Sequence, residues 1–248
     1  MAKLPKGAPK VYFSLRSPFS WMAVRRLRER VPDARELLDF IPFYEPDDRS
    51  AAMLAERGGE FHYVPMSKAK HLYILNDTKR LAARFGYAMK WPVDIDPVWE
   101  LPHLAWIVAG DLGVQDAYYD AVMAARWERG EDICDPAVLR GVLAGAGLPV
   151  EPLLGAPDDD AVRGRGVDAL MSMYSDDVFG VPYFKWGVHR FWGLDRLETF
   201  LDLLEPALPE LRARRAAVAP EAAPLAGLPE PALAAVGAYD RDTAGGCG

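Results

Sequence analysis

Regular patterns of apolar positions begin near the start of the chain. Side chains that favour strands fill residues 10–14 between a proline-containing lead and a turn, which is typical of a short strand. Apolar side chains then recur at helical spacing over residues 17–31, and an apolar run over residues 37–44 indicates a second strand. The order strand, helix, strand predicts a β-α-β unit with parallel strands and a right-handed crossover.

The pattern between residues 49 and 175 is mostly helical, with glycine or proline between successive segments. Beyond this block, apolar side chains on both sides of Gly187 predict a hairpin over residues 181–192. Residues 195–204 have the spacing of an amphipathic helix. The helices predicted inside the block cover residues 67–85, 101–112, 115–128, 136–146 and 158–173.

This order of elements predicts an α/β thioredoxin fold, βαβ followed by ββα, interrupted by a large helical insertion. Residues 10–48 and 176–205 then form the thioredoxin-like domain, and residues 49–175 form the insertion. Residues 206–248 are rich in alanine and proline, which predicts a disordered tail. A solvated tail is the simpler interpretation, and a partner-binding extension is the alternative.

Composition restricts the functional classes. A chain of 248 residues, half of them hydrophobic, can bury one core together with an insertion. Its formal net charge of -7 provides no general basic surface for nucleic acid. No run of about 18 uncharged apolar residues occurs, and the basic first residues lead into no apolar segment. We therefore expect a cytoplasmic protein that binds neither nucleic acid nor membrane.

Cysteine and histidine positions predict no metal site. Cys134 and Cys247 lie far apart and form neither a CxxC pair nor a cluster of metal ligands. The histidines also lack the spacing of metal ligands and are interpreted as solvated or hydrogen-bonded residues; they are His62, His71, His103 and His189.

The string Phe13–Trp21, FSLRSPFSW, lies at the junction of the first predicted strand and helix. The N-terminus of a helix carries unpaired N–H groups and a partial positive charge, so an anion is stabilised there. The hydroxyl of Ser17 could donate a hydrogen bond to the sulfur of a bound thiol and favour its thiolate form. Taken alone, Ser17 followed by Pro18 is more simply explained as ordinary helix capping.

Two later strings add to this signal. In Phe179–Phe184, FGVPYF, a cis peptide bond before Pro182 would present the backbone of Val181 as an edge for an extended peptide, whereas a trans proline at a strand start is the alternative. In Phe191–Leu197, FWGLDRL, Asp195 could cap the last helix or receive an ammonium group. Their order and spacing are more specific than any single string.

The three strings together resemble the 2-hydroxychromene-2-carboxylate isomerase family and its relatives, the kappa-class glutathione transferases. The resemblance extends from about residue 11 to residue 204 and includes Tyr73, Asp77, Arg80 and the Phe85-Gly86 stop. It implies a DsbA-like thioredoxin fold, a homodimer, glutathione as cofactor and a role in aromatic compound metabolism. In this family, glutathione sulfur adds reversibly to an unsaturated aromatic carbonyl compound, so that a double bond can rotate as a single bond.

The resemblance also implies roles for individual residues. Ser17 would be the catalytic residue that holds and activates the glutathione thiol. Val181 and Pro182 would pair with the cofactor's backbone, and Asp195 would bind its γ-glutamyl end. Leu194 would lie beside the cofactor's carboxylate. The helical insertion would form the pocket for the aromatic substrate.

Some positions depart from the family pattern. Ser14 stands where an acidic residue is usual, Arg16 where a hydrophobic residue is usual, and Leu194 where a polar residue normally hydrogen-bonds the cofactor. Arg16 could replace that anion recognition or meet an acidic substrate. The thiol could therefore be glutathione, another low-molecular-weight thiol, or none. The alternatives are a kappa-type glutathione transferase and a catalytically silent protein that binds a substrate or partner.

A disulfide oxidoreductase is excluded because Ser17 and Ser20 occupy the two positions of the redox pair, which leaves no dithiol to exchange. Aromatic residues of the insertion could line a cavity for a polycyclic substrate or could simply form the core. They are Trp91, Trp99, Trp106, Tyr118, Tyr119 and Trp127.

Overall fold

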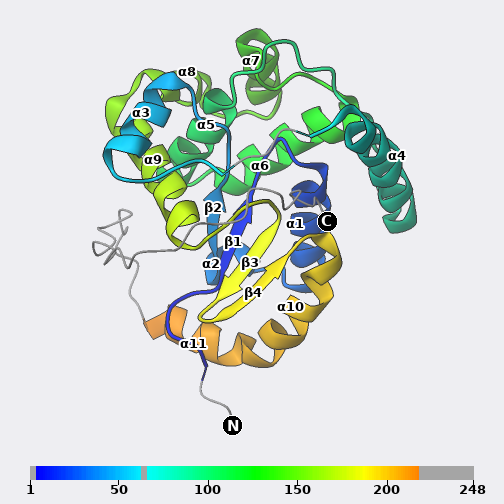
Figure 1. Cartoon of the computed structure of the whole chain (residues 1–248), viewed down its shortest axis with the longest axis vertical. Helices are drawn as coiled ribbons and strands as arrows, with labels where there is room; N and C mark the ends of the chain where they lie inside the picture. Colours follow the sequence, from blue (N-terminus) through cyan, green and yellow to red (C-terminus); the bar gives the residue numbers. More distant parts are fainter. Residues whose placement is uncertain (1–3, 63–65, 218–248) are drawn as a thin grey trace.

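The computed structural model describes residues 4–62 and 66–217. A four-stranded sheet has the order β2-β1-β3-β4, with helices packed on both faces and beyond one end (Figure 1). The strands are β1 (Lys10–Phe13), β2 (Asp39–Pro42), β3 (Tyr183–Trp186) and β4 (His189–Trp192). β1 pairs parallel with β2, and β3 pairs antiparallel with both β1 and β4. This is the predicted βαβ and ββα arrangement.

Alternation along β1 separates the two faces of the sheet. Val11 and Phe13 belong to the main core, in which α1 (Pro18–Arg30) and α10 (Leu197–Leu204) also bury their apolar sides. Tyr12 faces the other way, into a smaller cluster with Met173 of α9 (Asp160–Ser175). Successive side chains of a strand point to opposite faces, so this short strand contributes to both cores.

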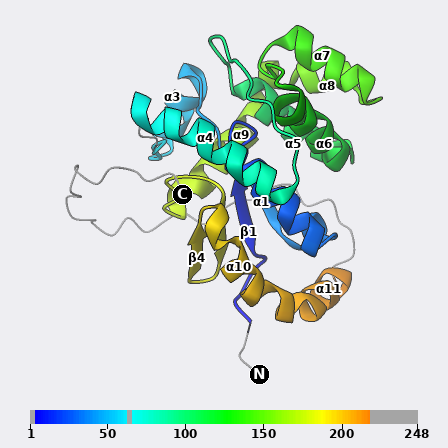
Figure 2. The same ribbon diagram turned by 90° about the vertical axis from the view of Figure 1, so that its right-hand side faces the viewer.

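Most of the insertion lies beyond the end of the sheet at which β1 finishes (Figures 1 and 2). Side-chain oxygens of aspartate or serine cap several of its helices by accepting backbone N–H groups, and Gly86, with a φ of 75°, ends α4. Its elements before α9 are α3 (Asp48–Glu56), α4 (Lys68–Phe85), α5 (Glu100–Asp111), α6 (Gln115–Met123), η1 (Ala124–Arg129), α7 (Pro136–Gly145), α8 (Val150–Leu154) and η2 (Ala156–Asp158).

The structure corrects some sequence-based boundaries. The helix predicted over 115–128 changes at residue 124 into a π-helical turn, η1. Short helices that the apolar pattern did not predict also occur, because one to about two and a half turns contain too few apolar positions for a periodic signal. They are α2 (Ala34–Leu37), α3, α8, η3 (Leu194–Arg196) and η4 (Glu205–Ala207).

The first part of the predicted tail is not disordered. Residues 208–217 form α11 (Leu208–Ala217), in which Leu208 and Leu211 are buried. Arg212 of α11 donates two hydrogen bonds to Asp33, beside α2. These two leucines, three positions apart, were sufficient to dock a helix although the surrounding composition suggested a tail. Residues 218–248 lie outside the described part of the chain.

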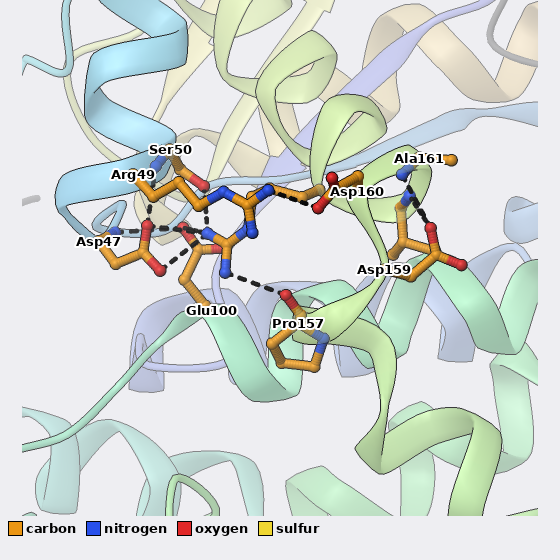
Figure 3. Close-up of polar contacts among 10 residues, drawn as sticks. Asp47, Arg49, Ser50, Glu100, Pro157, Asp159, Asp160 and Ala161 are labelled. Carbon is orange, nitrogen blue, oxygen red and sulfur yellow. Dashed lines mark hydrogen bonds and ion pairs between the residues drawn. The ribbon is translucent and has the colours of Figure 1, made fainter.

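Buried Arg163 joins several insertion helices, and its partners Asp47, Ser50, Glu100 and Pro157 lie close together in Figure 3. Arg163 of α9 donates from one nitrogen to both carboxylate oxygens of Asp47 and to Ser50 Oγ, each at 2.8 Å, and from the other to the Pro157 carbonyl at 3.0 Å. Glu100 of α5 lies 3.8 Å from the same guanidinium and accepts the Asp47 backbone N–H. The side chains of Arg163 and Glu100 are only 7% and 1% exposed.

No helix among the described residues is long and apolar enough to cross a membrane.

Helix α9 packs closely against its neighbours at Gly166. A Cβ atom at this position would lie 2.3 Å from the Tyr44 hydroxyl and 2.5 Å from a Leu104 methyl group. We expect Gly166→Ala to lower the free energy of unfolding by about 1–3 kcal/mol because the core is overpacked. Urea unfolding measures this loss. Gly141→Ala in α7 is the control: its Cβ would meet nothing within 4 Å, so alanine there should be neutral or stabilising. Equal effects of the two changes would contradict the prediction.

Candidate functional site

The three strings singled out in the sequence meet at one end of the sheet. Tyr12 pairs with Tyr183 and Tyr183 pairs with Trp192, so β1 and β4 finish where β3 begins. The Gly193 N–H, which follows β4, donates to the Pro182 carbonyl at 2.9 Å. Helix α1 contacts η3, which places the third string beside the first. Sheet topology therefore brings together segments far apart in the sequence.

Ser17 is the N-cap of α1, as its sequence context predicted. Its Oγ accepts a hydrogen bond from the Ser20 N–H at 3.1 Å, and the residue is half-buried. A hydroxyl has one proton and two acceptor lone pairs, and capping uses only an acceptor. The geometry therefore leaves the Ser17 proton available for donation, so capping and the activation of a bound thiol are compatible.

Ser20, at the second position of a redox pair, has a structural contact instead. It is fully buried, and its Oγ accepts the Ser14 N–H at 3.2 Å. The Ser17 N–H donates to the Ser14 carbonyl at 3.1 Å, so residues 14–17 form a turn before α1. We call these residues the site loop. Ser20 thus ties α1 to the end of β1.

His103 of α5 contacts the site loop from the insertion. Its Nε2 accepts the Leu15 N–H at 3.0 Å and lies 3.3 Å from Ser14 Oγ, while its Nδ1 lies 2.8 Å from the Trp99 carbonyl. These partners define a neutral imidazole that carries its proton on Nδ1. The ring is fully buried, and burial lowers the pKa of His103 to about 3. The interpretation of this residue as hydrogen-bonded is correct, but its contact with the loop was not predicted.

Arg16 extends over the surface beside Ser17. Its guanidinium lies 5.4 Å from the centre of the Trp99 ring and donates to Glu45 at 3.0 Å. The Glu45 carboxylate is about half exposed, so this pair is an exchangeable surface interaction. A carboxylate on a bound molecule could therefore compete with Glu45 for Arg16.

The second string leads into β3, the strand that pairs with β1. The Val181-Pro182 peptide bond is cis, which settles the question that the sequence left open. Val181 is half-buried and Pro182 is buried. The exposed ring of Phe179 packs edge-on against Trp192, with ring centres 4.7 Å apart. The segment therefore carries both partly accessible backbone and an exposed aromatic ring at the start of β3.

Asp195 does not cap the last helix, and that interpretation is wrong. It lies within η3, and the N-cap of α10 is Arg196, without a side-chain capping bond. The Asp195 carboxylate is exposed and accepts a hydrogen bond from Arg196 at 2.7 Å. Leu194, in contrast, is buried and packs in the main core. The 3₁₀ turn displaces the helix start and leaves Asp195 exposed in η3, the element that contacts α1.

Most of the candidate aromatic residues of the insertion are core residues. Trp99, Trp106, Tyr118, Tyr119 and Trp127 are at most 3% exposed, and only Trp91 is half-buried. Two surface hollows lie over α6 and α7 and between α1 and α6, with volumes of about 770 and 540 Å³. Ser17, Val181 and Asp195 do not line either hollow. Burial therefore supports the second of the two sequence-based interpretations, plain core, for Trp99, Trp106, Tyr118 and Trp127. Tyr119 is also buried but borders the second hollow.

Comparison with known proteins agrees with this architecture. Residues 10–205 match the DSBA-like thioredoxin domain. The chain belongs to this family. It is 27% identical to a 2-hydroxychromene-2-carboxylate isomerase of Sphingobium xenophagum over 191 residues, which are 75% of this chain and 92% of that protein. The family resemblance inferred from the three strings is thereby confirmed.

Solved structures give the same DsbA-like thioredoxin fold. A 2-hydroxychromene-2-carboxylate isomerase matches with a TM-score of 0.60 and 24% identity, over 86% of this chain and all of that one (100%). A probable DsbA oxidoreductase from Streptomyces coelicolor matches with a TM-score of 0.58 and 18% identity, over 82% and 90% of the two chains. At these identities the likeness concerns the fold, and the chemistry must be argued from the site of this DSBA-like protein.

Proposed function

We propose that this DSBA-like protein is a thiol-dependent isomerase of an aromatic or polyketide-like unsaturated carbonyl compound, with glutathione or another low-molecular-weight thiol as cofactor. The observation that carries the proposal is the hydroxyl of Ser17, placed at the start of a 13-residue helix with its proton available. Serine at both positions 17 and 20 leaves no protein thiol there for disulfide exchange. The similarity to an isomerase supports the same chemistry.

The residues around Ser17 fit a small thiol peptide. The positive end of α1 and the Ser17 hydroxyl both stabilise a thiolate over a thiol. Val181 offers backbone to an extended peptide, and the exposed Asp195 carboxylate can pair with an ammonium group. Pro182 and Leu194 are both buried and anchor the segments that carry Val181 and Asp195. The described surface therefore has a donor for the sulfur and a partner for a charged end.

A bound thiol would supply a nucleophile that adds reversibly to the unsaturated carbonyl compound, allows rotation about the former double bond, and is released unchanged. Ser17 holds the sulfur during both steps and returns to its starting state. Arg16 is placed to bind a carboxylate of the substrate or of the cofactor, in exchange for Glu45. A kappa-type transferase would use the same residues but would consume the thiol, so the amount of thiol after many turnovers separates the two activities.

Titration with glutathione tests the proposal. We expect thiolate ultraviolet absorbance and a raised thermal midpoint in the wild type, and an affinity for the thiolate lower by about tenfold in Ser17→Ala, because a hydrogen bond to a charged group is lost. Ser17→Ala also removes a helix cap. The control is therefore Ser67→Ala, which removes the cap of α4, where Ser67 Oγ accepts the Lys70 N–H. The control should lose a similar amount of stability and keep the thiolate signal. Absence of a response to glutathione and to other cellular thiols would favour a catalytically silent binding protein.

A further inference from the structure

The backbone N–H groups of the site loop donate hydrogen bonds to acceptors in two different parts of the chain. The N–H groups of Ser14, Arg16 and Ser17 are satisfied by Ser20 Oγ, Ser14 Oγ and the Ser14 carbonyl, which all belong to the loop or to α1. The Leu15 N–H is different, since it donates to His103, which lies 88 residues away on α5. Among these four N–H groups, it alone is satisfied by the insertion.

Packing holds the His103 ring in a single orientation. Tyr44 stacks on it with ring centres 5.0 Å apart and an interplanar angle of 21°, and Trp99 meets it edge-on at 6.2 Å. The bond from Nδ1 to the Trp99 carbonyl directs Nε2, the acceptor, toward Leu15 and Ser14. A buried N–H without a partner is costly, so the loop is held where this acceptor lies.

The position of the loop decides the direction of the Ser17 hydroxyl. Ser17 lies two residues after Leu15, and its own N–H is fixed to the Ser14 carbonyl. Displacement of Leu15 therefore changes the start of α1 and moves Ser17 Oγ relative to Val181 and Pro182 across the site. A displacement of about 1 Å is enough to weaken a catalytic contact substantially.

We propose that His103 is a positioning residue of the thiol site: through the Leu15 N–H, the insertion sets the orientation of the Ser17 hydroxyl. This inference rests on the proposed function, and it concerns a residue that does not contact the thiol or the substrate. The imidazole acts as a neutral hydrogen-bond acceptor and not as an acid or base. It links the helical insertion directly to the chemistry on the thioredoxin-like domain.

Two amide substitutions separate the acceptor from the donor of the ring. In His103→Gln the side-chain oxygen reaches the place of Nε2 and can accept the Leu15 N–H. In His103→Asn the amide reaches only the place of Nδ1, so it keeps the donor and loses the acceptor. Both variants are neutral and of similar size, and both forfeit part of the packing against Tyr44. A general loss of stability is therefore common to them, whereas the contact with the loop differs.

The test combines amide hydrogen exchange of Leu15 in the free protein with glutathione titration by thiolate absorbance. In His103→Asn we expect exchange of Leu15 to be faster by about tenfold or more and thiolate affinity to be lower by about five- to tenfold, the loss of one buried hydrogen bond. His103→Gln should restore both to within about threefold of the wild type. If the two variants lose thiolate affinity equally, in step with their thermal midpoints, the role is merely structural and the proposal is overturned.

If His103→Asn does not fold, a measurement on the wild type tests the same hydrogen bond. Nitrogen NMR should detect a scalar coupling across the hydrogen bond between the Leu15 nitrogen and His103 Nε2, and a proton on Nδ1. A protonated Nε2 or the absence of this coupling would overturn the proposal. If the wild type gives no thiolate signal, the proposed function fails, and the exchange of Leu15 still decides whether His103 holds the loop.

Discussion

Replacing Arg163 by methionine is expected to lower the free energy of unfolding by about 3 kcal/mol. This is the lower end of the loss for removing one partner of a buried ion pair, because Arg163 is 7% exposed but its partner Asp47 is 34% exposed. The guanidinium holds Asp47, Ser50 and the Pro157 carbonyl at 2.8–3.0 Å, in an interior shared by α3, α5 and α9. Methionine fills a similar volume but donates no hydrogen bond. Urea unfolding followed by circular dichroism measures the loss.

The electrostatics of this cluster explain the size of the effect. Burial opposes ionisation of Asp47, yet hydrogen bonds from Ser50 and Arg163 hold the pKa of its carboxyl below the usual value. Burial raises the pKa of Glu100, which is almost completely enclosed and lies 3.8 Å from the guanidinium. Without Arg163, two carboxyl groups face each other with no cation between them, and the Asp47 cap of α3 is weakened.

Arg165 provides the matched control for this prediction. It lies on the same helix and pairs with Asp111, but the two side chains are 33% and 50% exposed. Exposed ion pairs contribute about 0–1 kcal/mol, so Arg165→Met should change the free energy of unfolding by no more than that. If Arg163→Met were as mild as Arg165→Met, the buried cluster would not be an anchor of the insertion.

The second large effect is a pH dependence of stability that comes from His103. Its pKa falls from the model-peptide value of 6.5 to about 3 in the folded protein, first through burial and further through Arg126 and Arg16, while the hydrogen bond to Trp99 opposes the shift. Below pH 6.5 the unfolded chain therefore binds a proton that the folded chain does not. Stability is complete above pH 6.5 and decreases as the pH falls toward 3.

The expected size follows from the linkage relation. One pH unit corresponds to about 1.4 kcal/mol for a single proton, so the wild type should lose about 2 kcal/mol between pH 7 and pH 5 from this group. Carboxyl groups also titrate near this range, and the comparison with His103→Gln removes their common contribution. Urea unfolding at several pH values should give a shallower slope for His103→Gln than for the wild type.

His189, exposed on β4, is the control for the loss of an imidazole. His189→Gln should follow the pH profile of the wild type more closely than His103→Gln does. If the free energy of unfolding changed with the same slope in wild type and His103→Gln between pH 7 and pH 5, His103 would be protonated in the folded state. Its Nε2 could then not accept the Leu15 N–H.

Features with local causes could be derived from the sequence. Strand and helix order, the start of α1 at Ser17 and the end of α4 at Gly86 depend on residues within one or two turns of each other. Ser17 as a cap was evident for this reason. The three strings, each local, were sufficient to identify the family and its DsbA-like fold, which the match over residues 10–205 confirms.

Other features depended on packing between distant segments. Neither the Leu15–His103 contact nor the Arg163 cluster has a local signal. Leu15 and His103 are 88 residues apart, and Arg163 is more than 100 residues from Asp47 and Ser50. The docking of α11 and the 3₁₀ turn that exposes Asp195 likewise depend on the surface offered by neighbouring elements.

The sequence by itself therefore determined the order of the main elements, the family and the residue at the head of the proposed thiol site. Only the tertiary structure decided which side chains hold that residue in place, because burial makes each unpaired polar group costly and selects its partner by position in space. Ser17 was visible as a cap in the sequence; its dependence on His103 became visible only when α5 was placed against the site loop.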